Sequence, residues 1–159
     1  MKVSIVTAVY NGEDFIESTI QSVLSQTGVE IEYIIIDGNS TDNTMKIVNR
    51  HANKISKIIS EKDNGLYDAM NKGIKLATGN FIGILNSDDF YASDTIVSEI
   101  TNKIKETNSD MGYGDLLYVD RKTASKKKRF WKPGKFNPKK INYGWIPPHP
   151  TLFVTKEAY

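Results

Sequence analysis

The chain has 159 residues, enough for one domain with a sizeable core; 39% are hydrophobic and 25% charged, as in ordinary globular proteins. The absence of cysteine excludes disulfides and thiolate metal sites. Residues 1–120 hold 10 Lys and Arg against 18 Asp and Glu, whereas residues 121–159 hold 11 against a single acid. This asymmetry predicts an acidic part that can hold a cation and a basic part that faces an anionic partner.

The N-terminus, MKVSIVTAVYNGED, turns acidic after a short strand-like run, whereas a signal peptide needs a longer apolar stretch. No stretch approaches the ~20 apolar residues that span a bilayer. We therefore expect a cytoplasmic protein.

Apolar periodicity predicts alternating strands and helices over the first 110 residues. The predicted strands are 3–9, 31–37, 57–60 and 81–86, and the predicted helices are 13–26, 45–55, 66–77 and one that begins near residue 93. Asn11 is the expected N-cap of the first helix, and Gly79 is the expected C′ residue after the third. This alternation predicts an α/β fold with a mostly parallel central sheet and helices on both faces.

The pattern changes after Met111. Segments 112–120 and 125–131 are typical of two longer strands, predicted to be antiparallel, and a proline-rich stretch extends to Pro150. The last residues, TLFVTKEAY, are strand-like with no closing helix, so we expect a truncated chain.

Acidic residues follow two of the predicted strands, where ligands bind in such sheets. Asp88 and Asp89 in Asn86-Ser87-Asp88-Asp89 repel one another unless a cation or proton intervenes, and carboxylates suit Mg²⁺ or Mn²⁺. The alternative is a turn with one helix cap, but the position at a strand end favours the metal. Asp37 either bonds its own turn or accepts hydrogen bonds from a nucleobase or ribose. The loop after it lacks both dinucleotide-fold and P-loop spacing.

Four segments resemble, in order, the family-2 glycosyltransferases: VSIVTAVYNG (3–12), IIIDGNSTDNT (34–44), DNGLYDAMNKGIKLATG (63–79) and IGILNSDD (82–89). The resemblance is dense over about the first 90 residues and loose beyond them. It implies a nucleotide-diphospho-sugar transferase fold of the GT-A type with an added antiparallel portion. Residues 1–110 would then be the nucleotide-sugar-binding α/β portion, and residues 111–159 a basic, incomplete acceptor-side portion of the same domain.

The resemblance also implies roles for particular residues. The nucleoside would be held by Ala8, Tyr10, Glu13 and Asp37, with Asp68 near the donor phosphates or sugar. The family's metal motif is usually Asp-x-Asp. Because Asn86 occupies its first position, Asp88 would carry most of the Mn²⁺ or Mg²⁺ binding, with Asp89 as partner and Asn86 and Ser87 on the donor side. His149 is either a phosphate or metal contact or a turn residue fixed by its flanking prolines.

The implied activity is inverting transfer of a hexose, from UDP in preference to GDP, to a surface polysaccharide or lipid-linked glycan. The general base in the family lies on a helix beyond a strand like TLFVTKEAY, so we expect it beyond Tyr159 and assign no catalytic residue. One alternative is a nucleotide-sugar-binding module without transfer. The other is a nucleotidyltransferase, which would normally show a basic Gly-rich loop where VTAVYNGEDF is acidic.

The basic run Lys126, Lys127, Lys128 and Arg129 has three interpretations. It could be a solvated strand face, a nucleic-acid contact, or a peripheral contact with the anionic inner face of the membrane. The lipid-pyrophosphate acceptors of many family members favour the membrane, where each basic residue adds about 1 kcal/mol. We predict no nucleic-acid partner, because no base-reading module is recognisable and the acidic half would repel phosphates.

Overall fold

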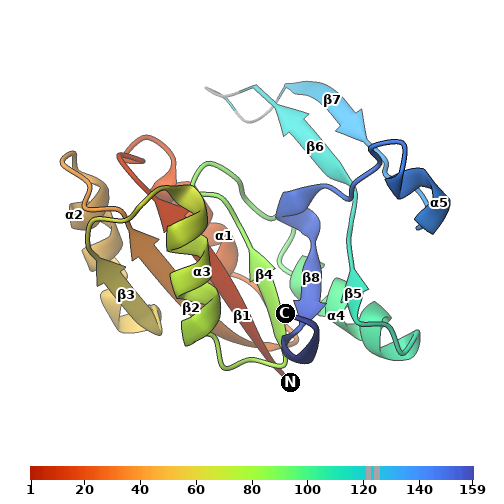
Figure 1. Ribbon diagram of the computed structural model, residues 1–159. Coiled ribbons are helices and arrows are strands. Elements are labelled where there is room, and N and C mark those ends of the chain that lie inside the picture. The colour runs from red at the N-terminus through yellow and green to blue at the C-terminus, as the bar shows by residue number, and fades with distance from the viewer. Residues whose placement is uncertain (121–122, 124–125) are drawn as a thin grey trace.

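A computed structural model describes residues 1–120, 123 and 126–159, and its main feature is one six-stranded sheet (Figure 1). The four parallel strands are β1 (Lys2–Val9), β2 (Glu30–Asp37), β3 (Lys57–Ser60) and β4 (Phe81–Ile84). The strands β5 (Met111–Gly112) and β8 (Phe153–Thr155) extend the sheet in the order β3-β2-β1-β4-β8-β5, with β8 antiparallel to both neighbours. The predicted α/β fold with a mostly parallel sheet is confirmed.

Strand β1 lies inside the sheet because its side chains are apolar toward both faces. Ile5 packs into the core on one face, and Val6 into the core on the other. A strand buried on both faces has a nearly continuous apolar run rather than an alternating one, and every residue of β1 after Lys2 is buried, including the small polar Ser4 and Thr7.

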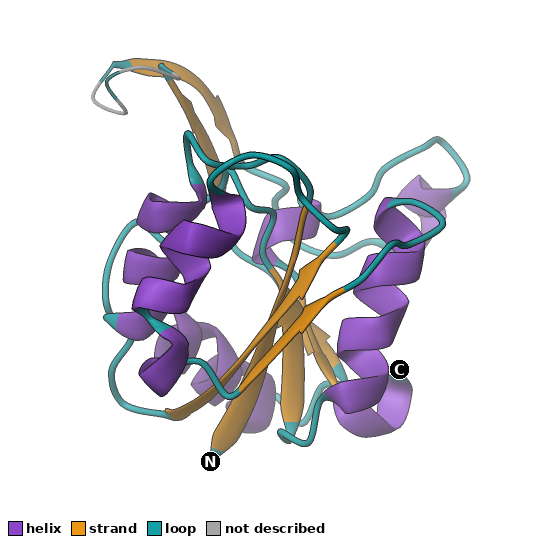
Figure 2. Ribbon diagram, turned by 90° about the vertical axis from the view of Figure 1, so that its left-hand side faces the viewer, coloured by secondary structure: helices purple, strands orange, loops and turns teal. Residues whose placement is uncertain are grey.

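Helices cover both faces of the sheet (Figure 2). One face packs against α1 (Ile16–Leu24), α2 (Thr44–Arg50) and α4 (Ile96–Glu106), and the other against α3 (Leu66–Leu76). Helix α3 approaches β1 so closely that a Cβ added to Gly73 would lie 2.2 Å from Val6 Cγ1. The short elements are η1 (Ala52–Lys54), α5 (Pro138–Ile141), η2 (His149–Thr151) and η3 (Lys156–Ala158). No helix in the described part of the chain combines the length and apolarity needed to cross a membrane.

The strands β6 (Leu116–Val119) and β7 (Lys127–Trp131) form a separate antiparallel hairpin, as predicted. Ser125, in the predicted second strand, lies outside the described residues. Figure 1 shows the hairpin above the sheet, on the side where β1 and β2 end. Strands β5 and β8, from residues 111–159, join the sheet whose other strands come from residues 1–110. The functional division between the two portions stays a prediction.

Two predictions about helix ends were wrong. Asn11 does not cap α1, which begins only at Ile16; Asn11 has φ 49° and its Oδ1 accepts a hydrogen bond from Thr41 N at 2.9 Å. Gly79 is not a left-handed C′ residue either. The position has no room for a side chain, because a Cβ on Gly79 would lie 2.7 Å from the backbone nitrogen of Ser4.

Candidate functional site

The candidate site lies where β1, β2 and β4 end. The chain leaves β1 toward β2 through α1 on one face and reaches β4 through α3 on the other. Loops therefore diverge between β1 and β4, and an open α/β sheet forms a ligand crevice at such a point. Tyr10 follows β1, Asp37 ends β2, and Asp88 follows β4, so the fold brings these predicted residues to the same edge.

The loops after β1 and β2 are joined by hydrogen bonds. The Asn11 backbone N–H donates to Ser40 Oγ at 2.8 Å. The Glu13 carboxylate accepts from the Asn43 backbone N–H at 2.8 Å and from Asn43 Nδ2 at 2.7 Å. Glu13 thus accepts from one backbone N–H and one side-chain amide at the start of α2, where helix termini leave backbone N–H groups without partners inside the helix. Its predicted contact with the nucleoside stays a prediction.

Asp37 is fully buried and both its carboxylate oxygens accept hydrogen bonds. Ser40 donates to it through its backbone N–H, at 3.1 Å from Oδ2, and through its hydroxyl. Ser60 Oγ, at the end of β3, donates to Oδ2 at 2.6 Å. Asp37 therefore fixes the loop after β2 to the end of β3, which is the turn interpretation. A contact with base or ribose stays a prediction.

Tyr10 and Asp63 flank Gly38. The Tyr10 side chain is 64% exposed, so its ring presents a face beside the loop. A Cβ on Gly38 would lie 2.7 Å from Asp63 Oδ2 and 3.5 Å from Tyr10 Cδ2. Asp63 was not assigned a role from the sequence. Its position just after β3, another strand that ends at this edge, is the signal that could have identified it.

The loop after β4 is held down on α1. The buried Thr19 hydroxyl contacts two carbonyl oxygens, those of Ser87 and Asp89, each at 2.8 Å. Asn86 Nδ2 donates to Asp89 Oδ2 at 2.8 Å. This arrangement leaves the Asp88 side chain exposed and that of Asp89 half-buried.

Asp89 is electrostatically coupled to its neighbours. Burial raises the pKa of Asp89, and the hydrogen bond from Asn86 lowers it. The nearby Asp88 carboxylate raises this pKa further, and His149 lowers it. His149 lies in η2, which packs against β4, so the fold brings it within electrostatic reach of Asp89.

The two adjacent carboxylates fit a hard divalent cation. Within the described residues, no three His, Asp or Glu side chains converge on a complete metal site. Mg²⁺ does not need a complete set of protein ligands, because it is commonly held by one or two carboxylates together with substrate phosphates and water. Asp88 and Asp89 are two such carboxylates, and a cation would relieve their mutual repulsion; their binding of a metal stays a prediction.

The other two predicted residues have structural roles. Ala8 is buried in the core on the α3 side of the sheet, and its contact with the nucleoside stays a prediction. Asp68 accepts a hydrogen bond from the Asn64 backbone N–H at 3.0 Å and lies 3.4 Å from Lys72 Nζ. The Asn64 hydrogen bond and then Lys72 hold the pKa of Asp68 below its ordinary value. Asp68 thus stabilises the start of α3, and its contact with the donor stays a prediction.

Comparison with known proteins identifies the family. The model of "Glycosyl transferase family 2" matches residues 4–155. The chain belongs to this family. It is 38% identical over 146 residues to the UDP-Glc:alpha-D-GlcNAc-diphosphoundecaprenol beta-1,3-glucosyltransferase WfaP of Escherichia coli, covering 89% of this chain and 54% of that protein. The chain spans about half the length of curated relatives such as this one.

Solved structures support the GT-A type of fold. The crystal structure of S. aureus TarS 1–349 in complex with UDP-GlcNAc is similar at a TM-score of 0.63 and 28% identity, over 70% of this chain and 33% of that one. The mannosyltransferase PcManGT from Pyrobaculum calidifontis, solved with GDP-Man and Mn²⁺, has a TM-score of 0.68 at 17% identity, over 98% and 44% of the chains. The second likeness concerns the fold alone.

Proposed function

We propose that this chain is the donor-binding part of a transferase that moves a hexose from UDP to a lipid-linked or surface glycan, with inversion and with Mn²⁺ or Mg²⁺. The observation that carries this proposal is the Asp88–Asp89 pair at the same sheet edge as the exposed Tyr10 ring. The name of the relative WfaP supports the donor and the acceptor, and the similar structure of TarS was solved in complex with UDP-GlcNAc. The beta linkage in the relative's name supports inversion, because UDP-glucose is α-linked.

The nucleoside would lie between the loops after β1 and β2. Tyr10 offers an aromatic face for stacking, and Asp63 offers a carboxylate that, like the Tyr10 ring, lies beside Gly38. Uracil carries one ring N–H between two carbonyls, and a carboxylate is a matched acceptor for that donor. Ala8 would shape this pocket, and Glu13 and Asp37 would hold its loops in place.

The diphosphate would lie over the loop after β4. A bound divalent cation would stabilise the negative charge that develops on the leaving phosphates. Asp88 would be its first protein ligand, with Asp89 and His149 completing the protein side, and Asn86 and Ser87 would contact the donor. Thr19 would keep both carboxylates in place through the Ser87 and Asp89 carbonyls. The base that deprotonates the acceptor hydroxyl would belong to residues beyond Tyr159.

A lipid-linked acceptor would place the enzyme at the inner face of the membrane in the cytoplasm, where nucleotide sugars are available. Lys126, Lys127, Lys128 and Arg129 of the hairpin would then contact anionic lipid. A module that binds the donor without transferring it has the same site, so the first experiment tests binding and the second tests transfer.

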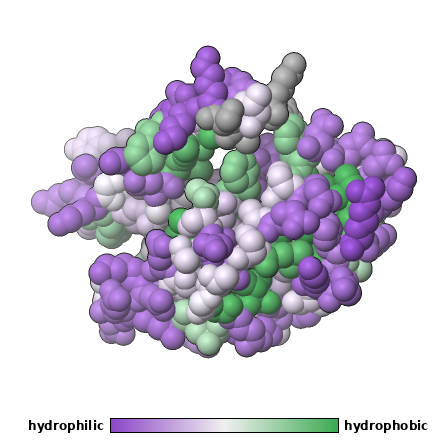
Figure 3. Space-filling view, turned by 180° about the vertical axis from the view of Figure 1, so that it is seen from behind, coloured by the Kyte–Doolittle hydropathy of each residue, from purple (hydrophilic) through white to green (hydrophobic). Residues whose placement is uncertain are grey.

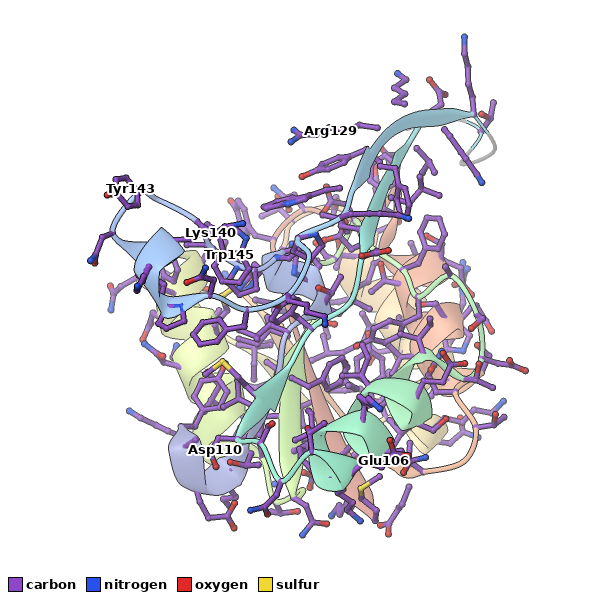
Figure 4. All side chains as sticks on the ribbon, turned by 90° about the vertical axis from the view of Figure 1, so that its right-hand side faces the viewer. Glu106, Asp110, Arg129, Lys140, Tyr143 and Trp145 are labelled. Atoms are coloured by element: carbon purple, nitrogen blue, oxygen red, sulfur yellow. The ribbon has the colours of Figure 1, made fainter. Side chains whose placement is uncertain are left out.

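The donor site is tested by calorimetric titration of UDP, GDP, CDP and ADP, each with and without Mn²⁺. We expect UDP to bind most tightly, only with the metal, and at least about tenfold more weakly to Asp88→Asn. The matched control is Asp110→Asn, an exposed acid at the opposite end of the molecule (Figure 4). Equal affinities of the folded wild type and Asp88→Asn would overturn the metal assignment. Asp63→Asn should reduce the preference for UDP over CDP.

Transfer is tested on a longer form of the protein that includes residues after Tyr159. With UDP-glucose and a lipid-pyrophosphate-linked GlcNAc acceptor, we expect a β-linked product. A longer form that binds UDP with Mn²⁺ but transfers no sugar to any lipid-linked acceptor would favour the binding module.

A further inference from the structure

A second surface outside the donor site combines cations with exposed apolar side chains. We call it the basic apolar surface and define it as residues 126–132 of the hairpin and residues 139–146 of α5 and the following turn. The sequence has no acid between Arg121 and Lys156. Figure 4 shows Arg129, Lys140 and Tyr143 toward the upper end of the molecule, with Glu106 and Asp110 toward the lower end. In the view from behind (Figure 3), hydrophilic side chains gather at the top, where the hairpin lies in Figure 1.

Large apolar side chains on this surface point into solvent. Tyr143 is 90% exposed, and Phe130, Ile141 and Ile146 are each more than half exposed. Isolated exposed apolar residues are common, but four of them among lysines form a mixed surface of the kind that marks an interaction site.

The cations of the hairpin lie against its aromatic rings. The Arg129 guanidinium lies 5.5 Å from the centroid of the Tyr118 ring and 5.8 Å from that of Trp131. Lys132 Nζ lies 5.1 Å from the Phe130 ring. Among the described cations of this surface, only Lys128 forms an ion pair, with Asp120 Oδ2 at 3.0 Å. Most of its positive charge is therefore available to an external anion.

The two halves of the surface are joined by a small aromatic cluster. The Tyr113 and Trp145 rings meet edge to face with centroids 5.8 Å apart, and Phe136 lies 5.8 Å from Trp145. The Tyr113 hydroxyl donates to the Gly134 carbonyl at 2.9 Å, and Trp145 Nε1 donates to the Pro133 carbonyl at 3.2 Å. The segment that follows the hairpin is thus held against the turn that follows α5 by packing and hydrogen bonds.

We propose that the basic apolar surface docks on an anionic lipid bilayer through both the hairpin and the α5 turn. Ile141, Tyr143 and Ile146 would enter the headgroup region, while lysines and Arg129 would pair with lipid phosphates. Charge complementarity selects an anionic partner. The aliphatic tips select lipid over nucleic acid, because a base stacks on aromatic rings and gains little from Ile141 or Ile146.

This inference rests on the proposed function in one respect, the lipid-linked acceptor. The hairpin lies on the side of the sheet where β1 and β2 end, which is also the side of the donor site (Figure 1). A bilayer held there would bring the pyrophosphate head of such an acceptor toward Asp88. Membrane docking would therefore orient the enzyme as well as concentrate it.

The test is co-sedimentation with vesicles of 70% phosphatidylcholine and 30% phosphatidylglycerol, against vesicles of phosphatidylcholine alone. The charge variant is Lys127→Ala/Lys139→Ala/Lys140→Ala, which removes three exposed cations of the surface. Each cation contributes about fivefold to binding, so we expect a loss of roughly 100-fold, shrinking as salt rises. The matched control Lys46→Ala/Lys54→Ala/Lys105→Ala removes the same charge from exposed positions elsewhere and should bind like the wild type.

A second variant, Ile141→Ser/Tyr143→Ser, keeps every charge and should weaken binding at both low and high salt. Equal binding by the charge variant and its control would overturn the proposal, as would tighter binding to a single-stranded RNA oligonucleotide than to the anionic vesicles. UDP titration of the same preparations separates the two claims. Vesicle binding without UDP binding would overturn the donor site alone, and UDP binding without vesicle binding would overturn the docking surface alone.

Discussion

Glu32→Gln tests whether a buried carboxylate holds the end of α3 against the sheet. Glu32 lies on β2 at the edge opposite the donor site and is only 4% exposed. Its carboxylate accepts hydrogen bonds from the hydroxyl of Ser4 at 2.5 Å and from the backbone N–H and hydroxyl of Thr78, both at 2.7 Å. Lys2 Nζ lies 3.2 Å away. The substitution keeps the shape of the side chain but removes its charge.

The expected magnitude follows from the pKa of Glu32. Burial alone would raise it, but the hydrogen bonds from Ser4, Thr78 and Lys2 outweigh burial and lower the pKa to about 2 from an ordinary value of 4.5. That lowering corresponds to roughly 3 kcal/mol of folding free energy at neutral pH. Because the folded pKa lies below the unfolded one, this stabilisation is complete above about pH 4.5 and is lost as the pH falls toward 2.

Urea unfolding followed by circular dichroism at pH 7, 4.5 and 3 measures the effect. We expect Glu32→Gln to be about 2–3 kcal/mol less stable than the wild type at pH 7, with less than half of that difference left at pH 3. The control is Glu61→Gln, whose 2.8 Å ion pair with Lys72 is exposed and should be worth under about 1 kcal/mol. A difference that is independent of pH, or equal losses in the two variants, would refute the reasoning.

Three further predictions concern packing and the site loops. Gly73→Ala should destabilise the fold by about 1–3 kcal/mol in urea unfolding, because the added Cβ would overlap Val6. The control Asn71→Ala, at an exposed position of the same helix, should leave the stability unchanged, and equal stabilities of the two variants would contradict the packing argument. Thr19→Val should lower the folding stability by about 1–3 kcal/mol, because the Ser87 and Asp89 carbonyls would lose the hydroxyl that contacts them both. Calorimetry should also show weaker binding of UDP with Mn²⁺, and an unchanged affinity would exclude a positioning role for Thr19. Asp37→Ala should cost about 2–3 kcal/mol by freeing Ser40 and Ser60, and a neutral effect on urea unfolding would contradict its structural role.

The parallel core could be predicted from the sequence because its signals are local. Residues 3–9 and 31–37 are mostly apolar runs of strand length, and the helix between them carries apolar residues at helical spacing. The position of Asp88 after the last of these strands was equally readable, since strand order alone places it at the ligand edge.

What could not be predicted depends on contacts between distant residues. The pairing of β8 with β4 joins Phe153 to Gly83, and no local pattern specifies that partner. Asn11 and Glu13 look like helix-start residues, but their side chains bond the neighbouring loop, so α1 begins later. The position of Asp63 just after β3 places it at the ligand edge, but its proximity to Gly38 exists only once β2 and β3 lie side by side.

The hydrogen bonds that join the loops after β1 and β2 have a consequence for how specificity could change. Asn11 and Glu13 fix one loop to the other before any ligand arrives, so the proposed nucleoside site is preorganised and binding there should cost little conformational entropy. A preorganised frame also confines variation to side chains that project from it. Donor preference could then change through substitutions at Tyr10, Gly38 or Asp63, leaving the backbone intact, and related chains could diverge in substrate while keeping one scaffold.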